Sequence, residues 1–237
     1  MKVSVLINSL NHGEYIEKAI QSVLSQDYPR DLYELVVVDA GSTDNTPRVL
    51  EKYSSELRVV HQRGKLGLAR GCNIGIKECR GKYMVRLDAD DEFCQHILRI
   101  ESIYLDENSE FDFVYPDYYV KKGSASRRFS LPPFDVTEIR QRGDFLGGGT
   151  MYRRDVFEKY GYYDEDFRTI ENYELIIRLI RSEVKGYHIK LPLFTYNLHE
   201  DSMSHNMAGV LEDGRKLEAK FGIKYVMGKY YPRNVDN

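Results

Sequence analysis

Four short, mostly apolar segments alternate with stretches of helical spacing in the first 90 residues, and this alternation restricts the fold more than any other feature. The four segments are predicted strands: Val3–Ile7, Leu35–Val38, Arg58–Gln62 and Tyr83–Leu87. Apolar runs of this length are typical of strands that a parallel sheet buries on both faces. The sequence therefore predicts an α/β fold, with a mostly parallel central sheet and helices on both faces.

The remaining elements follow from apolar periodicity and from Gly and Pro positions. Helices are expected at Tyr15–Leu24, Pro47–Ser54, Leu66–Cys79 and Asn172–Ser182, and further strands at Phe111–Val120 and Leu191–Leu198. Lys121–Arg128 is expected to be a mobile polar loop, and Glu200–Ala208 a candidate lid. The chain is long enough for one domain with a substantial core.

Composition excludes some classes of function. Lysine and arginine number 34 against 37 acidic residues, a net charge of −3, so the chain lacks the basic surface of a nucleic-acid-binding protein. Its three cysteines show no metal-ligand spacing, and Cys72 and Cys79 share one helix face, which predicts buried thiols in a reducing compartment. No apolar stretch approaches 18 residues and no signal peptide is evident, so a cytoplasmic location is expected.

Polar residues follow three of the predicted strands directly. They are Ser9–Asn11, Asp39 and Asp88. In open α/β sheets, ligands bind beyond the carboxyl ends of the strands. We therefore expect these three segments to converge on one binding site.

The third of these segments, Asp88-Ala89-Asp90-Asp91, carries three carboxylates within four residues. They repel one another unless a cation lies among them, and their oxygen atoms suit Mg²⁺ or Mn²⁺. A helix N-cap is the alternative, because Asp caps helices well. Its place at a strand end favours the metal site.

Asp39 also ends a predicted strand, and there it can accept hydrogen bonds from a nucleobase or a ribose hydroxyl. The alternative is that it only shapes the following turn. Asp44, in the same turn, is expected to cap the next helix and to have a structural role.

The chain resembles family 2 glycosyltransferases, whose fold is the Rossmann-like GT-A fold. The resemblance covers about residues 3–205 and rests on several segments in the family's order. They are Val3–Asn11, Tyr15-Ile16, Ser22–Pro29, Val36–Thr46, Gly67–Asn73, Leu87–Asp91, Gly148–Thr150, Phe167–Arg178 and Tyr196–Ser204. The resemblance implies a single domain of residues 1–237. Residues 1–110 would form the nucleotide-sugar-binding half, residues 111–208 the acceptor-side half, and residues 209–237 a C-terminal helix and tail.

The resemblance also implies roles for individual residues. The nucleotide-sugar site would comprise Ser9, Leu10, Asn11, Glu14, Asp39, Arg70, Asp88 and Ala89. Within it, Asp39 would bind the base, often uracil, and Asp88 the ribose. Asp90 would ligate a divalent metal, Mn²⁺ or Mg²⁺, and His199 would complete that metal site or contact the diphosphate.

The sequence departs from the family's pattern at four places. The usual Pro-Thr-Tyr-Asn is Asn8–Asn11, which removes an aromatic stacking partner for the base, and Ala40 replaces the second Asp of a pair. Arg86 occupies a strand position that is usually apolar, where a long side chain can bury its stem. The fourth departure is Asn172, where the family usually has the Asp that acts as general base.

An amide cannot accept a proton at neutral pH, so Asn172 leaves the base open. Glu171 is one candidate, and Asp164 or Asp166 is another. The third possibility is a chain that binds the donor and transfers slowly.

The implied activity is metal-dependent, inverting transfer of a sugar from a nucleoside-diphosphate sugar, with UDP favoured, to a glycan, lipid-linked or other hydroxyl acceptor. One alternative is a nucleotide-sugar-binding protein with impaired transfer. A sugar-nucleotidyltransferase is a weaker alternative, because residues 8–14 contain one Gly and no Lys or Arg. Tyr, Lys and Arg residues near the C-terminus allow a peripheral membrane contact at the inner face, although an ordinary amphipathic helix and tail explain them too.

Overall fold

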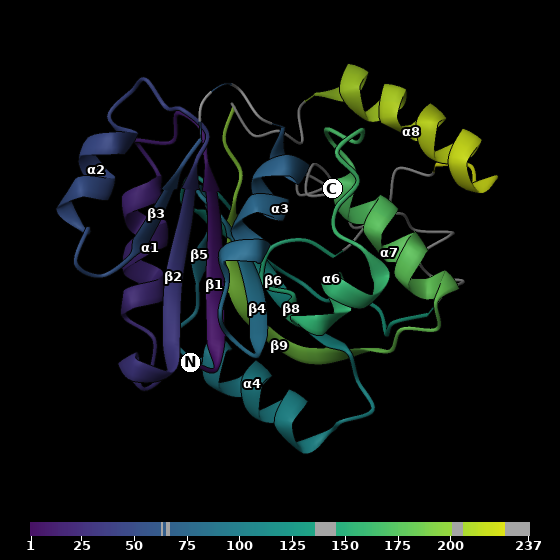
Figure 1. The fold of residues 1–237 in the computed structure, drawn as a ribbon, viewed down its shortest axis with the longest axis horizontal. Helices are drawn as coiled ribbons and strands as arrows, with labels where there is room; N and C mark the ends of the chain where they lie inside the picture. Colours follow the sequence, from purple (N-terminus) through teal and green to yellow (C-terminus); the bar gives the residue numbers. More distant parts are fainter. Residues whose placement is uncertain (63, 65–66, 136–145, 201–205, 226–237) are drawn as a thin grey trace.

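One mixed sheet runs through the molecule, in a computed structural model that describes residues 1–62, 64, 67–135, 146–200 and 206–225. Its strands lie in the order β3-β2-β1-β4-β8-β6-β9-β5, and β7 pairs with β6 (Figure 1). The four N-terminal strands are parallel: β1 (Val3–Ser9), β2 (Tyr33–Asp39), β3 (Arg58–His61) and β4 (Tyr83–Asp88). The parallel direction of these four strands is as predicted, and the structure adds their order.

The second half of the chain extends the same sheet. β8 (Met151–Arg153) runs antiparallel to β4 and to β6 (Phe113–Lys122), and β9 (Gly186–Asn197) runs parallel to β6. The two-residue strand β5 (Glu92–Phe93) closes the edge beside β9. Because β6 and β9 run in the same direction as β4, the carboxyl ends of β1, β2, β3, β4, β6 and β9 face one edge of the sheet.

Helices cover both faces of the sheet, as predicted. α1 (Ile16–Leu24) contacts α2 (Thr46–Lys52) on one face, and α3 (Leu68–Glu78) packs on β1 and β2 from the other, as right-handed crossovers require (Figure 1). The second half adds α4 (Ile97–Glu107), α6 (Asp155–Tyr160), α7 (Glu171–Arg181) and α8 (Met207–Phe221), and a 3-10 turn spans Arg30–Leu32. No helix in the described ranges is long and apolar enough to cross a membrane.

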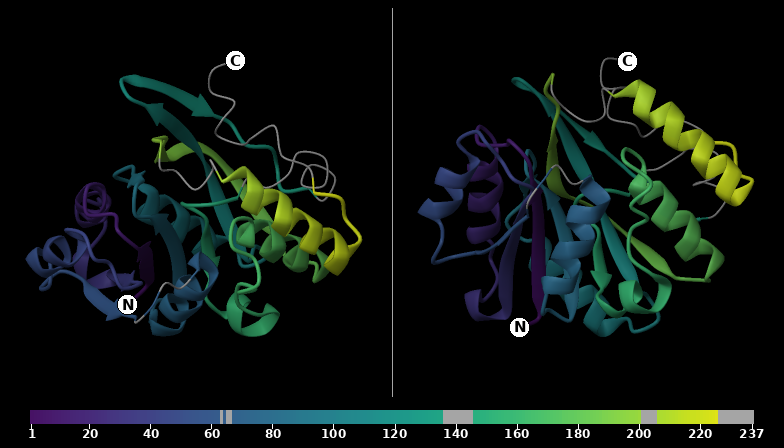
Figure 2. Two further views of the ribbon diagram at one scale, coloured as in Figure 1. Left: turned by 90° about the horizontal axis from the view of Figure 1, so that it is seen from above. Right: turned by 45° about the horizontal axis from the view of Figure 1, so that its top comes forward.

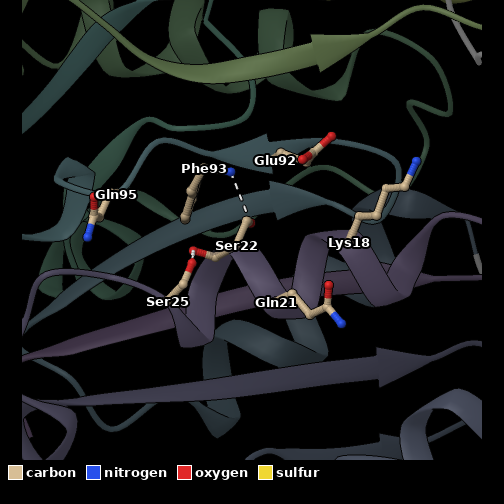
Figure 3. Close-up of a pocket in the computed structure, with 7 residues that line it drawn as sticks. All are labelled: Lys18, Gln21, Ser22, Ser25, Glu92, Phe93 and Gln95. Atoms are coloured by element: carbon tan, nitrogen blue, oxygen red, sulfur yellow. Dashed lines mark hydrogen bonds between the residues drawn. The ribbon is translucent and has the colours of Figure 1, made fainter.

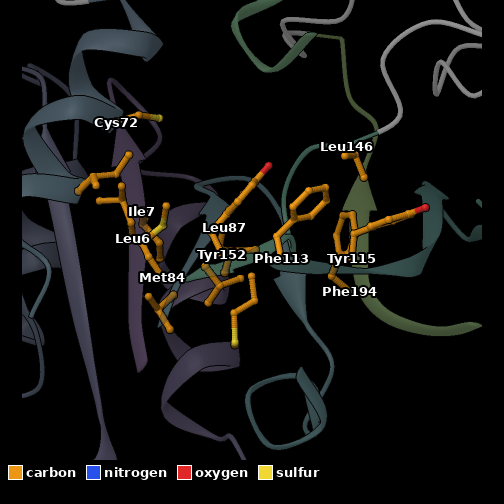
Figure 4. Packing of buried hydrophobic residues seen from close by; sticks show 14 of the residues in the cluster. Leu6, Ile7, Cys72, Met84, Leu87, Phe113, Tyr115, Leu146, Tyr152 and Phe194 are labelled. Carbon is orange, nitrogen blue, oxygen red and sulfur yellow. The ribbon is translucent and has the colours of Figure 1, made fainter. Parts of the chain in front are cut away.

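Side chains from both halves form one continuous core. Leu6, Ile7, Met84 and Leu87 from β1 and β4 lie near Phe113, Tyr115, Tyr152 and Phe194 from β6, β8 and β9 (Figure 4). α3 approaches β1 so closely that a Cβ on Gly75 would lie 2.2 Å from a methyl carbon of Leu6, which explains a glycine inside this helix. Cys72 and Cys79 are buried free thiols, as predicted.

Several sequence predictions needed correction. Lys121–Arg128 is not a loop, because β6 continues to Lys122 and pairs in an antiparallel hairpin with β7 (Ala125–Phe129). β9 begins five residues before the predicted Leu191, and α4, α6, β5 and β8 were not predicted. Of the predicted lid, residues 201–205 lie outside the described residues, and Met207 and Ala208 belong to α8.

Strand register brings the predicted strand ends together. Ser9 on β1 is the partner of Asp39 on β2, and Asn8 is the partner of Asp88 on β4. The predicted convergence is therefore confirmed, and it defines the edge at which a site can form.

Candidate functional site

The three carboxylates that follow β4 separate onto three different partners. Arg86 Nε lies 3.2 Å from Asp88 Oδ1, and His199 Nε2 lies 2.9 Å from Asp90 Oδ2. The backbone N–H of Asn197 donates to Asp91 Oδ1 at 2.8 Å. Each carboxylate thus has its own basic or hydrogen-bonding partner, which offsets part of the repulsion among the three acids.

Asp90 and His199 form the part of this site that suits a metal. Their side chains are 19% and 17% exposed, so both are ordered by packing and remain accessible. The ring of Tyr15, just before α1, stacks on the His199 ring with centroids 4.4 Å apart. Carboxylate oxygen and imidazole nitrogen are both good ligands for Mn²⁺.

Within the described ranges, no group of three or more His, Cys, Asp or Glu side chains is arranged to hold a metal ion. Among the described residues, Asp90 and His199 would thus be the two ligands, and water and substrate oxygens could occupy further positions. This division is usual where a cation binds together with a phosphate-bearing substrate. The residues present fit such a cation.

Asn197, at the end of β9, holds the acidic segment in position through hydrogen bonds, a role that was not predicted from the sequence. Its side-chain amide donates to the backbone oxygen of Asp90 at 2.8 Å and to Glu92 Oε1 at 3.2 Å. Its backbone N–H holds Asp91, as described above. Its position two residues before His199 at a strand end is the only sequence signal that could have identified it.

Asp91 is a buried, structural member of the acidic segment. It is 1% exposed, and burial followed by the negative charges of Asp90 and Asp88 raises its pKa well above the usual value. Its Oδ2 has no hydrogen-bond partner among the described residues. Asp91 therefore holds the end of β9 rather than facing a ligand.

The predicted base-binding residues surround the ends of β1 and β2. Asp39 is 4% exposed, and its Oδ1 accepts a hydrogen bond from the Ser42 N–H at 3.0 Å. Asn11 has a φ of 59°, and its Oδ1 accepts from the Thr43 N–H at 2.8 Å. These bonds tie the loop after β1 to the turn after β2.

The other predicted residues near the ends of β1 and β2 differ in their hydrogen bonds and in their exposure. Asp44 accepts from the N–H groups of Gly13 and Thr46 at 2.8 and 2.9 Å and so ties the loop after β1 to the start of α2, although the N-cap residue of α2 is Asn45 and not Asp44. Ser9 is buried and Glu14 is exposed. Leu10 is half-buried, and its backbone N–H donates to His12 Nδ1 at 3.2 Å.

Arg70 and Ala89 differ in exposure. Arg70, on α3, has a side chain that is 58% exposed and lies 3.9 Å from Glu165. Ala89 is 2% exposed, so its contribution is backbone and close packing.

A buried arginine links the acidic segment to α7. Arg86 is 5% exposed, and its Nη1 lies 3.2 Å from Oε1 of Glu171, the first residue of α7. Burial opposes the charge of Arg86, yet neighbouring groups, Asp88 foremost among them, raise its pKa above the usual value. Burial likewise raises the pKa of Glu171, which is 2% exposed.

The other candidates for the base are arranged differently. Asn172, the second residue of α7, is half-buried. Asp164 is bound by Lys220 at 2.5 Å, and Asp166 is exposed. Of the three candidate carboxylates, Glu171 alone contacts a residue that also contacts Asp88.

A shallow pocket lies on the α1 side of β5. It is lined by Lys18, Gln21, Ser22, Ser25, Glu92, Phe93 and Gln95 (Figure 3). None of the predicted site residues lines it, so it is separate from the strand ends described above.

Comparison with known proteins identifies the family. The model of "Glycosyl transferase family 2" matches residues 4–161. The chain belongs to glycosyl transferase family 2.

Two relatives in this family are the glycosyltransferase GlyG of Streptococcus pneumoniae and the poly(ribitol-phosphate) beta-N-acetylglucosaminyltransferase TarS of Staphylococcus aureus. GlyG is 31% identical over 66% of this chain and 55% of its own length. TarS is 31% identical over 73% of this chain and 31% of its own length. The chain thus spans about half of GlyG and a third of TarS.

Solved structures show the same fold. Residues 1–349 of S. aureus TarS in complex with UDP-GlcNAc superpose with a TM-score of 0.74 at 22% identity, covering 86% of this chain and 61% of that one. The mannosyltransferase PcManGT from Pyrobaculum calidifontis, in complex with GDP-Man and Mn²⁺, gives 0.71 at 18% identity, covering 92% and 63%. The family 2 chain described here therefore has the GT-A fold that its sequence predicts.

Proposed function

We propose that this chain transfers a sugar from a UDP-sugar to a hydroxyl group of a glycan or lipid-linked acceptor. The observation that carries the proposal is the pairing of Asp90 with His199 at the strand ends where Asp39 and Asp88 also lie. UDP is favoured because TarS, which shares the fold, was solved with UDP-GlcNAc.

In this proposal the residues at each strand end bind a different part of the nucleotide-sugar. Asp39 and the loop of Ser9, Leu10 and Asn11 would bind the base, Asp88 would bind the ribose, and Arg70 would lie beside the base or diphosphate. Asp90 and His199 would hold a divalent cation. When bound, that cation would neutralise charge on the departing diphosphate.

Glu171 is proposed as the base that takes the proton of the acceptor hydroxyl. Its raised pKa suits a general base, and Arg86 connects it to Asp88. The reaction would be a single displacement with inversion at the anomeric carbon, so that the acceptor oxygen bonds as the bond to the diphosphate oxygen breaks.

Asn172 supports a second candidate function, namely a protein that binds a nucleotide-sugar and transfers it slowly or not at all. General-base assistance contributes roughly 10²–10⁴ to a rate, so its loss would leave only slow turnover. The structure of the donor site would be the same in both cases.

Measuring the release of nucleoside diphosphate distinguishes a sugar transferase from a protein that only binds the nucleotide-sugar. The full chain is incubated with Mn²⁺ and each of UDP-GlcNAc, UDP-glucose, UDP-galactose and GDP-mannose, and release of nucleoside diphosphate is followed with and without a poly(ribitol phosphate) acceptor. Metal-dependent release of UDP supports the transferase. Binding of UDP-sugars with no release under any condition supports the second candidate, and no binding of any donor contradicts both.

A further inference from the structure

The helix that carries the proposed base at its first residue, α7, has no side-chain cap. Its N-cap residue is Ile170, whose apolar side chain cannot accept hydrogen bonds from the first turn. The Ile170 backbone oxygen accepts from the N–H groups of Tyr173 and Glu174 at 3.0 and 3.2 Å. The position of Glu171 therefore depends on what holds the chain directly before Ile170.

A buried carboxylate on α8 holds that part of the chain. Asp213 is 2% exposed, and its Oδ2 accepts hydrogen bonds from the Arg168 N–H at 2.7 Å and from the Thr169 N–H at 2.8 Å. The Thr169 hydroxyl donates to the same oxygen at 2.9 Å. One carboxylate oxygen thus binds three donors of the two residues that precede Ile170. Hydrogen bonds to an ionised acceptor are about twice as strong as those between neutral groups.

The surroundings of Asp213 keep its carboxyl group ionised. Burial opposes the charge, but hydrogen bonds from the Lys216 ammonium, 2.9 Å from Oδ1, and from the N–H of Arg168 outweigh burial and lower the pKa of Asp213. A negative charge beside the residues that lead into α7 also complements the positive end of that helix.

Further contacts fit α8 closely against the same loop. Lys216 Nζ donates to the Asp166 backbone oxygen at 2.9 Å, and a Cβ on Gly209 would lie 2.8 Å from the methyl carbon of Thr169. In both panels of Figure 2, α8 (yellow) lies alongside α7 (green). The loop before α7 is therefore enclosed by α8 on the side where Asp213 binds it.

We infer that Asp213 is a positioning residue for sugar transfer, which fixes the loop before α7 so that Glu171 is held where it can take the proton of the acceptor hydroxyl. This inference rests on the proposed function, in which Glu171 is the base. Arg86 contacts the Glu171 carboxylate from β4, and Asp213 fixes the backbone two residues before Glu171 from α8.

Asp213 should affect the transfer step and leave donor binding unchanged. Among the described residues, its hydrogen-bond and ion-pair partners are Arg168, Thr169 and Lys216, so it contacts neither Asp90 nor His199. A shift of about 1 Å at a catalytic group can lower a rate by about 10²-fold. Loss of Asp213 should therefore lower kcat and leave the KM for the donor nearly unchanged.

The test compares the full-length parent with D213A, D213N and the control R181Q. D213N keeps an oxygen that can accept from both backbone N–H groups. The control removes a different contact between α7 and α8, in which Arg181 Nη2 donates to the Phe221 backbone oxygen at 2.6 Å. Release of nucleoside diphosphate is followed with Mn²⁺ and the donor, among the four named above, that the parent uses fastest. Urea unfolding of each variant gives its folded fraction, so that kcat refers to folded protein.

D213A is expected to lower kcat about 10- to 100-fold with little change in KM and in Mn²⁺-dependent UDP binding, D213N to retain more activity than D213A, and R181Q to retain that of the parent. Because Asp213 acts through Glu171, D213A should cause no further loss of kcat in an E171Q background. A purely structural effect on the fold would lower kcat in both backgrounds.

An unchanged kcat in D213A, an equal loss in R181Q, or a full further loss in the E171Q background would overturn the inference and leave the proposed function standing. Full activity of E171Q would contradict Glu171 as the base, and the inference with it. A parent protein that releases no nucleoside diphosphate from any of the four donors would contradict both the inference and sugar transfer.

Discussion

Arg86 Nη1 and Glu171 Oε1 lie 3.2 Å apart in the interior of the protein, where the two side chains are 6% and 3% exposed. Nε of the same guanidinium lies 3.2 Å from Asp88 Oδ1. Arg86 thus joins the end of β4 to the first residue of α7. Since removing one partner leaves the other charge buried and unpaired, this link should matter to stability as well as to the site.

Arg86→Met is expected to lower the free energy of unfolding by about 3–5 kcal/mol, because Glu171 then lacks its cation. The double variant Arg86→Met/Glu171→Met should recover the part of that loss that comes from the unpaired Glu171, whereas Asp88 still lacks its cation in both variants. Urea denaturation of the parent, the two single variants and the double variant measures the coupling. A double variant that loses the sum of the two single effects would show that the pair is not coupled.

Substitutions at the start of α7 test the proposed base. Glu171→Gln should lower kcat by about 10²–10⁴ while the KM for the UDP-sugar changes little, because the amide cannot accept the proton. Asn172→Asp should have a much smaller effect. A gain of that size in Asn172→Asp would instead mean that the native chain lacks its base and that Glu171 is only a partner of Arg86.

Asn197→Ala should weaken Mn²⁺-dependent UDP binding by up to about thirtyfold, because it removes the side-chain hydrogen bonds to Asp90 and Glu92, each worth about 1 kcal/mol. Calorimetric titration of UDP measures the effect. Asn108→Ala is a matched control, since among the described residues its side-chain amide donates only to the Tyr104 backbone oxygen on α4. Equal UDP affinities in the two variants would remove Asn197 from the site.

Glu101 on α4 should make stability depend on pH. It is fully buried, neither of its carboxyl oxygens has a hydrogen-bond partner among the described residues, and burial raises its pKa well above the usual value. The folded state therefore holds a proton that the unfolded chain releases above about pH 4.3. This contribution to stability is complete below that pH and is lost as the pH rises through the folded-state pKa.

Glu101→Met is accordingly expected to stabilise the protein by about 1–3 kcal/mol at pH 7, with a smaller gain at pH 4. Thermal or urea unfolding at the two pH values gives the comparison. Glu101→Gln removes the titration but keeps a buried polar group, so it should abolish the pH dependence with less gain in stability. A variant whose advantage grows toward low pH would contradict the assignment.

The sequence predicted the N-terminal half of the fold well, because Val3–Ile7 and Tyr83–Leu87 are each apolar at all but one position and their carboxyl ends carry polar residues. It predicted the second half less well, because the strands there lack that pattern. Lys121–Arg128 has no apolar residue apart from Gly123 and Ala125 and no apolar–polar alternation, so nothing in its side chains distinguishes an exposed hairpin from a loop. Only the pairing of β6 with β7 makes it a strand.

The candidate site, like the fold, could be predicted from the sequence only in part. Asp39, Asp88 and Asp90 could be proposed from their places at strand ends. The partners of Asp91 and Glu171 could not, since Asn197 and Arg86 act across 106 and 85 residues of sequence, respectively. In the sequence Arg86 is only an unusual residue in an apolar strand, and its role follows from the contact with Glu171 on α7.

The most direct test of the central proposal is calorimetric titration of UDP into the full chain with and without Mn²⁺, in the parent protein, Asp90→Ala, His199→Ala and the exposed control Asp155→Ala on α6. The parent and the control should bind UDP more tightly with Mn²⁺ than without it, and the other two variants should lose most of that difference. An undiminished Mn²⁺ effect in Asp90→Ala would contradict the assignment of this site.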